Sequence, residues 1–185
     1  MRYSKSEAGG KGFHLQTMKE GGLPVPQFYC IPWSQLKQLF ADNNPDFWFD
    51  LNHEMEAVFS NYQLDLESIC AVVQKKIQQV KISERAWTEF ASRIQHEFGV
   101  EYLVSVRSSA IDEDSDHTSF AGQHLTELFI GPSGILSAIK NCLASAWSFG
   151  AISYRLLHNL PVHNIQFAIV IQQMVNASKS GIGFS

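Results

Sequence analysis

The chain has 185 residues, 45% of them hydrophobic, which is enough to bury the core of one domain or of two small ones. Its formal net charge of −4 argues against a nucleic-acid partner, because such proteins normally carry clustered lysines and arginines. The three cysteines lie far apart without metal-ligand spacing, which predicts reduced, buried thiols. We find neither a signal-peptide pattern nor an apolar run of about 20 residues, so a cytoplasmic protein without a membrane partner is expected.

The N-terminal segment predicts a helix over residues 11–20, bounded by glycine pairs at 9–10 and 21–22. Lys11 is then at a helix start, where free backbone N–H groups and the helix dipole favour an anion. A lysine beside two glycines adds a positive charge within reach of a phosphate. The alternative is a solvated lysine on the first helical turn. The spacing of a Walker A loop is absent.

The next part of the chain is mainly helical in pattern. After a proline-containing connector we expect a strand over residues 27–31 and a short helix over 33–41. Apolar residues then recur at helical spacing from 46 to 99, which predicts a helical insert or subdomain. Ser83 is expected to begin its last helix and Gly99 to end it.

A central stretch over residues 102–130 carries the candidate chemistry. A strand over 103–106 is predicted to present Arg107 at its end, where the planar guanidinium suits phosphate oxygens. An acidic segment follows, and then small residues that let backbone N–H groups approach an anion. These small-loop residues are Ser119, Phe120, Ala121 and Gly122. The alternative is a surface arginine paired with a nearby aspartate, followed by an ordinary hairpin loop.

The C-terminal part predicts one long helix or two abutting helices over residues 135–157, with Gly150 as a possible interruption. Residues 166–175 are apolar and β-branched, which indicates a strand in the centre of a sheet. Gln172 is the polar residue near the end of this strand. The alternative for Gln172 is a side chain that faces water.

Four ordered segments resemble one family. The sequence VRSSAIDEDSDHTSFAGQ at 106–123 is similar to the signature of the nucleotide-binding domain in phosphoenolpyruvate synthases, pyruvate phosphate dikinases and rifampin phosphotransferases. The other three segments are GGKGFHL at 9–15, GLPVP at 22–26, and VIQQMV at 170–175 followed by GIGFS at 181–185. The resemblance implies an α+β, ATP-grasp fold with a mixed or antiparallel sheet, packed helices and a helical insert over 46–99. Residues 1–185 would form its N-terminal lobe, without the second lobe.

The resemblance also implies roles for particular residues. Lys11 and Arg107 would neutralise the phosphates of ATP as catalytic residues, and the loop over residues 119–122 would cover them. The positions that would border adenine are Gln172, Met174 and Val175. Mg²⁺ is expected as a cofactor, with its ligands in the second lobe and none in this chain.

The implied function is the ATP-binding portion of a phosphoenolpyruvate synthase-like phosphotransferase that phosphorylates pyruvate through a phosphohistidine in other domains. This chain alone is expected to be inactive, because phosphoryl transfer needs metal and charge from several directions. One alternative keeps the ATP site in an antibiotic phosphotransferase, and another is a non-catalytic binding module. We also expect an exposed apolar surface near the C-terminal strand, and self-association through it.

Overall fold

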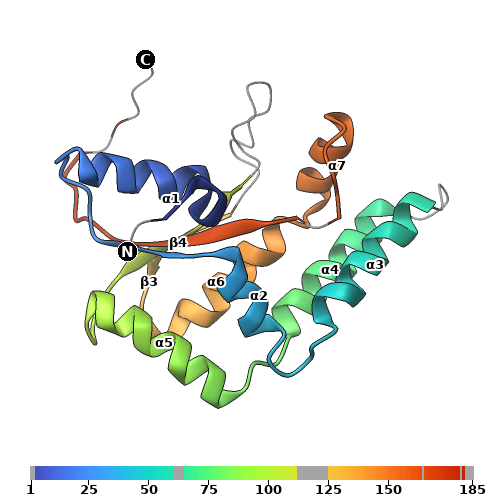
Figure 1. Ribbon diagram of the computed structural model, residues 1–185, viewed down its shortest axis with the longest axis horizontal. Helices are drawn as coiled ribbons and strands as arrows, with labels where there is room; N and C mark the ends of the chain where they lie inside the picture. Colours follow the sequence, from blue (N-terminus) through green and yellow to red (C-terminus); the bar gives the residue numbers. More distant parts are fainter. Residues whose placement is uncertain (1–2, 61–64, 112–124, 164, 180, 182–185) are drawn as a thin grey trace.

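The computed structural model describes residues 3–60, 65–111, 125–163, 165–179 and 181, with the backbone alone at 57–60. In this part of the chain an antiparallel four-stranded sheet has the order β1-β4-β2-β3 (Figure 1). The strands are β1 (Phe28–Ile31), β2 (Val104–Ala110), β3 (Thr126–Ile130) and β4 (Phe167–Gln173). With the helices described below, this confirms the predicted α+β class and antiparallel sheet.

Strand β4 lies between β1 and β2, and its first five residues are buried, which confirms its predicted central place. Side chains alternate between the two faces of the sheet. Val106 and Ile169 belong to the main hydrophobic core, whereas Ala168 and Val170 belong to a smaller cluster under α1 (Lys5–Glu20). Figure 1 shows α1 on one side of the sheet and α2, α5 and α6 on the other. The sheet therefore has a thick helical side and a second face that α1 covers.

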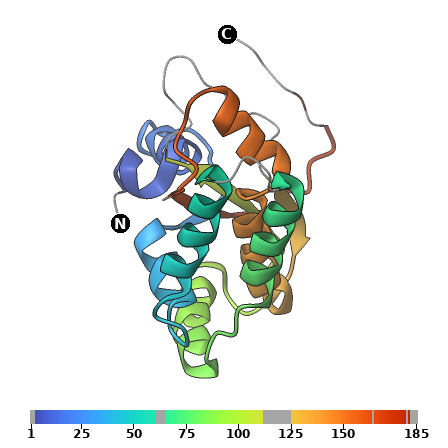
Figure 2. The same cartoon turned by 90° about the vertical axis from the view of Figure 1, so that its right-hand side faces the viewer.

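The remaining helices lie across the sheet from α1 or, in the case of α7, beside the start of β4 (Figure 1). They are α2 (Trp33–Phe40), α3 (Phe47–Ser60), α4 (Leu66–Gln79), α5 (Glu84–Phe98), α6 (Ile135–Ser145), α7 (Phe149–Leu157) and the short 3₁₀ helix η1 (Pro132–Gly134). The predicted helical stretch over 46–99 corresponds to α3, α4 and α5. Met55, Val73 and Phe90 from these helices join the same core as the sheet, which α3 and α4 reach through α6 (Figure 2).

The ends of α5 agree with the sequence. Ser83 Oγ accepts a hydrogen bond from the Ala86 N–H at 3.1 Å, which satisfies one of the free donors at the helix start. Gly99 follows the last turn with a φ of 86°, a conformation that favours glycine. The predicted boundaries of this helix are confirmed.

Two predicted boundaries are wrong. Helix α1 begins at Lys5, not at residue 11, because a cap forms earlier: the Ser4 N–H donates to Glu7 Oε2 at 3.0 Å. The same bond lowers the pKa of Glu7. Strand β2 does not stop before Arg107 but runs to Ala110, because the ladder with β4 continues to the end of both strands.

The stretch from Pro132 to Leu157 is long and apolar enough, by length and composition, to cross a membrane, a feature that the sequence pattern did not reveal. It is the one such stretch in the described residues, and 56% of its most apolar window is buried inside the protein. It is also divided, since Ser148 caps a separate α7 by accepting the Ala151 N–H at 3.2 Å. These are the features of core helices, and they resolve the prediction of one helix or two in favour of two.

Candidate functional site

Helix α1 is kinked at Gly9, whose φ of 65° and ψ of 178° are not helical. In a continuous helix the Gly12 N–H would donate to the carbonyl of Ala8. Here the Gly12 N–H donates to Ser109 Oγ on β2, at 3.2 Å, and the Ala8 carbonyl accepts a weak bond from Cys30 Sγ at 3.8 Å. Burial raises the pKa of the Cys30 thiol to about 12, so this thiol keeps its proton. The residues on either side of the kink thus make hydrogen bonds to two strands, β2 and β1.

Glycine is required at position 9 for two reasons. Its combination of φ and ψ is one that glycine alone adopts without strain. A Cβ atom there would also lie 2.3 Å from the Ser109 carbonyl oxygen. The turn over residues 9–12 is therefore seated directly on β2. Lys11, which is half-buried, lies in this turn, two residues after the kink.

Arg107 lies in the middle of β2, opposite Val170 of β4 and Thr126 of β3. By alternation it shares a face with Ser109, and this is the face that α1 covers. The Arg107 side chain is half-buried, and its Nε is buried with no hydrogen-bond partner among the described residues. Buried donors are nearly always paired, so an unpaired guanidinium N–H marks a place where an acceptor fits. The structure thus brings Arg107 and the turn that carries Lys11 to one face of the sheet.

Gln172 lies on the same face, because its neighbours across the sheet are Ser105 on β2 and Phe28 on β1. The Gln172 side chain is half-buried, and the main-chain carbonyl oxygen of Gln172 accepts a hydrogen bond from Ser105 Oγ at 3.4 Å. Met174 lies just past β4, and its N–H already donates to the Leu103 carbonyl at 2.9 Å. Val175 is 58% exposed. Of the three residues expected to border adenine, Gln172 therefore lies near the end of β4 on the Arg107 face, and Met174 and Val175 follow the strand.

The predicted loop of Ser119, Phe120, Ala121 and Gly122 lies outside the described residues. Within the described residues no group of three or more histidine, cysteine, aspartate or glutamate side chains is placed to hold a metal ion. This part of the chain does not by itself fit a magnesium site.

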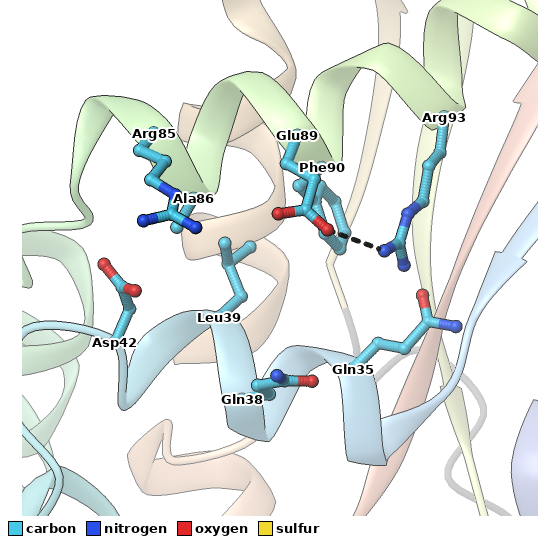
Figure 3. Close-up of a pocket in the computed structure, with 9 residues that line it drawn as sticks. All are labelled: Gln35, Gln38, Leu39, Asp42, Arg85, Ala86, Glu89, Phe90 and Arg93. Atoms are coloured by element: carbon cyan, nitrogen blue, oxygen red, sulfur yellow. Dashed lines mark hydrogen bonds and ion pairs between the residues drawn. The ribbon is translucent and has the colours of Figure 1, made fainter.

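A groove of about 250 Å³ lies on the thick side of the sheet, between α2 and α5 (Figure 3). Arg93 and Glu89 form an ion pair across one helical turn at 3.2 Å, and Asp42 accepts the Ser83 N–H at 3.2 Å. None of the predicted site residues that the structure describes lines this groove. The ion pair lies within α5, and the Asp42 bond joins the segment after α2 to the residue that caps α5.

Sequence reasoning missed the part that Ser109 plays in this site. Ser109 is fully buried, and it contacts both Gly9 and Gly12, which flank Lys11. Alternation along β2 could have placed Ser109 on the Arg107 face. Its contact with α1 depends on how the kinked helix sits on the sheet, for which the sequence has no local signal.

Comparison with known proteins places the chain in a family. Residues 5–185 match the family described as pyruvate phosphate dikinase, AMP/ATP-binding domain. The chain is 30% identical over 179 residues to a rifampicin phosphotransferase of Streptomyces sviceus, which covers 96% of this chain and 20% of that protein. It is 30% identical over 183 residues to a probable phosphoenolpyruvate synthase of Methanothermobacter thermautotrophicus, with 96% of this chain and 26% of that protein covered.

A phosphoenolpyruvate synthase of Pyrococcus furiosus is 28% identical over 216 aligned residues, again with 96% of this chain and 26% of that protein covered. The chain thus spans between a fifth and about a quarter of the length of these relatives. The match runs through α1, the helical stretch and all four strands of the sheet. This chain belongs to the pyruvate phosphate dikinase AMP/ATP-binding domain family.

Proposed function

We propose that residues 1–185 are the N-terminal lobe of an ATP-grasp nucleotide-binding domain in a phosphoenolpyruvate synthase-like phosphotransferase. In the whole protein, ATP would be cleaved and a phosphoryl group passed through a phosphohistidine to pyruvate. Mg²⁺ would be held by a second lobe. A cytoplasmic location is part of this proposal.

The observation that carries the proposal is the unpaired, buried Nε of Arg107 on the face that α1 covers. An anion placed there would give this N–H an acceptor and would meet a positive charge that water only partly screens. The turn of α1 that carries Lys11 is seated on the same strand. A phosphate group is the anion for which a nucleotide-binding family would use two such cations.

The other proposed roles concern the adenine ring and the loop that would cover the phosphates. Gln172 would border the adenine with Met174 and Val175, while Ser119, Phe120, Ala121 and Gly122 would cover the phosphates. Because the Met174 N–H is already bonded to Leu103, a main-chain contact from Met174 to adenine would use its carbonyl. Lys11 and Arg107 would act on the phosphates during transfer.

A second candidate function keeps the same ATP site and changes the acceptor. Relatives named rifampicin phosphotransferase and relatives named phosphoenolpyruvate synthase have similar identities to this chain, near 30%. The acceptor would bind outside the part of the relatives that this chain spans. A non-catalytic binding module is a third candidate, and the presence of both Lys11 and Arg107 in one site argues against it.

The test is calorimetric titration of ATP with magnesium into this chain and into Lys11→Ala and Arg107→Ala variants. Each substitution should weaken ATP binding about tenfold or more, because a hydrogen bond to a charged group contributes about 1.5–3 kcal/mol. The matched controls are Lys75→Ala and Arg85→Ala, which remove exposed cations from α4 and α5 on the other side of the sheet. Binding that is unchanged in the Lys11 and Arg107 variants, or absent from the unsubstituted chain, contradicts a phosphate half-site here.

A further inference from the structure

Ser108 and Ser109 are neighbours on β2 with opposite surroundings. Both are buried, with 1% and 0% of their surface exposed. Successive residues of a strand face opposite sides, so Ser109 faces α1 and Ser108 faces the main core. Ser109 Oγ accepts the Gly12 N–H at 3.2 Å, whereas Ser108 Oγ has no partner in the described part of the chain. The two hydroxyls therefore form a natural pair for comparison.

The buried N–H of Gly12 donates to Ser109 directly after the kink at Gly9. The Ala8 carbonyl, which is the helical acceptor for this N–H, is shared with Cys30 Sγ at 3.8 Å. If the Ser109 hydroxyl is removed, the buried donor loses its acceptor on β2, and the turn loses this hydrogen bond to the strand. Any movement of the turn carries Lys11 with it, since Lys11 lies between the two glycines that contact Ser109.

We propose that Ser109 is a positioning residue that holds the 9–12 turn of α1, and with it Lys11, on the Arg107 face of the sheet. The link to ATP binding rests on the proposed role of Lys11 at the phosphates. Ser109 itself touches no nucleotide in this proposal. It acts by supplying one hydrogen bond from β2 to the kinked part of the helix.

The first experiment measures the turn without any nucleotide. Amide hydrogen exchange is followed by NMR in Ser109→Ala and Ser108→Ala, at a temperature where thermal unfolding shows both variants to be folded. The Gly12 amide should exchange about two- to tenfold faster in Ser109→Ala, the size of one neutral hydrogen bond, and at the unsubstituted rate in Ser108→Ala. Equal exchange of Gly12 in the two variants overturns the proposal.

The second experiment links the turn to Lys11 through a double-mutant cycle on ATP affinity. Ser109→Ala should weaken ATP binding about two- to tenfold, and this effect should disappear when Lys11 is already alanine. Ser108→Ala should leave ATP affinity unchanged. Effects of Ser109→Ala and Lys11→Ala that simply add overturn the link to Lys11. A Lys11→Ala variant that binds ATP normally contradicts the proposed function instead, and the exchange of Gly12 then decides whether Ser109 holds the turn.

Discussion

The packing of α1 against β2 depends most directly on Gly9, because the backbone conformation of Gly9 and its contact with Ser109 both exclude a side chain. We expect Gly9→Ala to lower the free energy of unfolding by about 2–5 kcal/mol, through backbone strain and overpacking together. Urea unfolding of the two proteins measures the difference. Gly22→Ala is the matched control, since Gly22 has a φ of 78° but no heavy atom within 4 Å of the place that a Cβ atom would take. An equal loss in both variants would show that the Ser109 contact contributes nothing.

The buried thiols make stability depend on pH in the alkaline range. Burial raises the pKa of Cys30 and Cys142 to about 12 and that of Cys70 to about 11, with nearby carboxylates adding to the effect. The unfolded thiols ionise near pH 9, so their contribution to stability is complete below pH 9 and is lost as the pH rises toward 12. We expect the free energy of unfolding to fall on the order of 1 kcal/mol per thiol between pH 8 and pH 10.

Urea unfolding at the two pH values checks this expectation. Cys142→Ala should lower stability at pH 8, because it leaves a cavity, and should flatten the decline toward pH 10. An unfolding free energy that is the same at pH 8 and pH 10 would contradict the assignment of all three thiols as buried acids.

At the scale of elements, helix α5 allows a direct test of how much its N-terminal cap contributes to the stability of the protein. Ser83→Ala removes the oxygen that accepts the Ala86 N–H and should destabilise the protein by about 1 kcal/mol. Ser92→Ala is the matched control in the same helix, where the hydroxyl is exposed and bonds only the Glu89 carbonyl in the preceding turn. Alanine there should be neutral or slightly stabilising. Thermal unfolding distinguishes the two outcomes, and an equal melting temperature for the two variants would contradict the role of the cap.

Elements with a strong local signal could be predicted from sequence. Helix α5 has both a capping serine and a terminal glycine, and β4 has a continuous apolar run, so their type and place are correct. The sequence pattern predicts too early an end for strand β2, because Arg107 and the serines after it have a low preference for strands. Its true length comes from pairing with β4, more than fifty residues later, and no local pattern records that pairing.

The candidate site was predictable to a similar extent. The resemblance points to Lys11 and Arg107 as candidates, and strand alternation is enough to place Arg107 and Ser109 on one face. The kink at Gly9 is not predictable from sequence, because it depends on how closely α1 approaches β2. A Cβ atom on Gly9 would lie only 2.3 Å from the Ser109 carbonyl oxygen. Two glycines before a lysine fit an ordinary helix start equally well.

At the scale of the whole molecule, exposed apolar side chains collect at the end of the sheet where β2 begins and β3 and β4 end. This apolar rim consists of Leu103, Leu128, Phe129 and Val175, which are between 52% and 64% exposed. Phe129 also has a φ of 59°, in a bulge of β3 opposite β2. Exposed apolar side chains gathered at one end of a sheet favour association.

We therefore expect this chain to self-associate at high concentration in sedimentation experiments. Leu128→Glu combined with Phe129→Asn should shift the protein toward monomer, and asparagine suits the left-handed backbone at position 129. Leu157→Glu, at a 78% exposed position at the end of α7, is the control and should leave association unchanged. A clean monomer for the unsubstituted chain at high concentration would contradict the prediction.

The central claim is that the α1 face of the sheet around Arg107 is the nucleotide site. The most direct measurement is an NMR titration of the labelled chain with ATP and magnesium, in which backbone amide shifts locate the bound nucleotide. We predict saturable shifts at residues 9–12 and 107–109, and near Gln172, with little change along the groove between α2 and α5. Shifts confined to that groove, or no shifts at any ATP concentration, would contradict the claim.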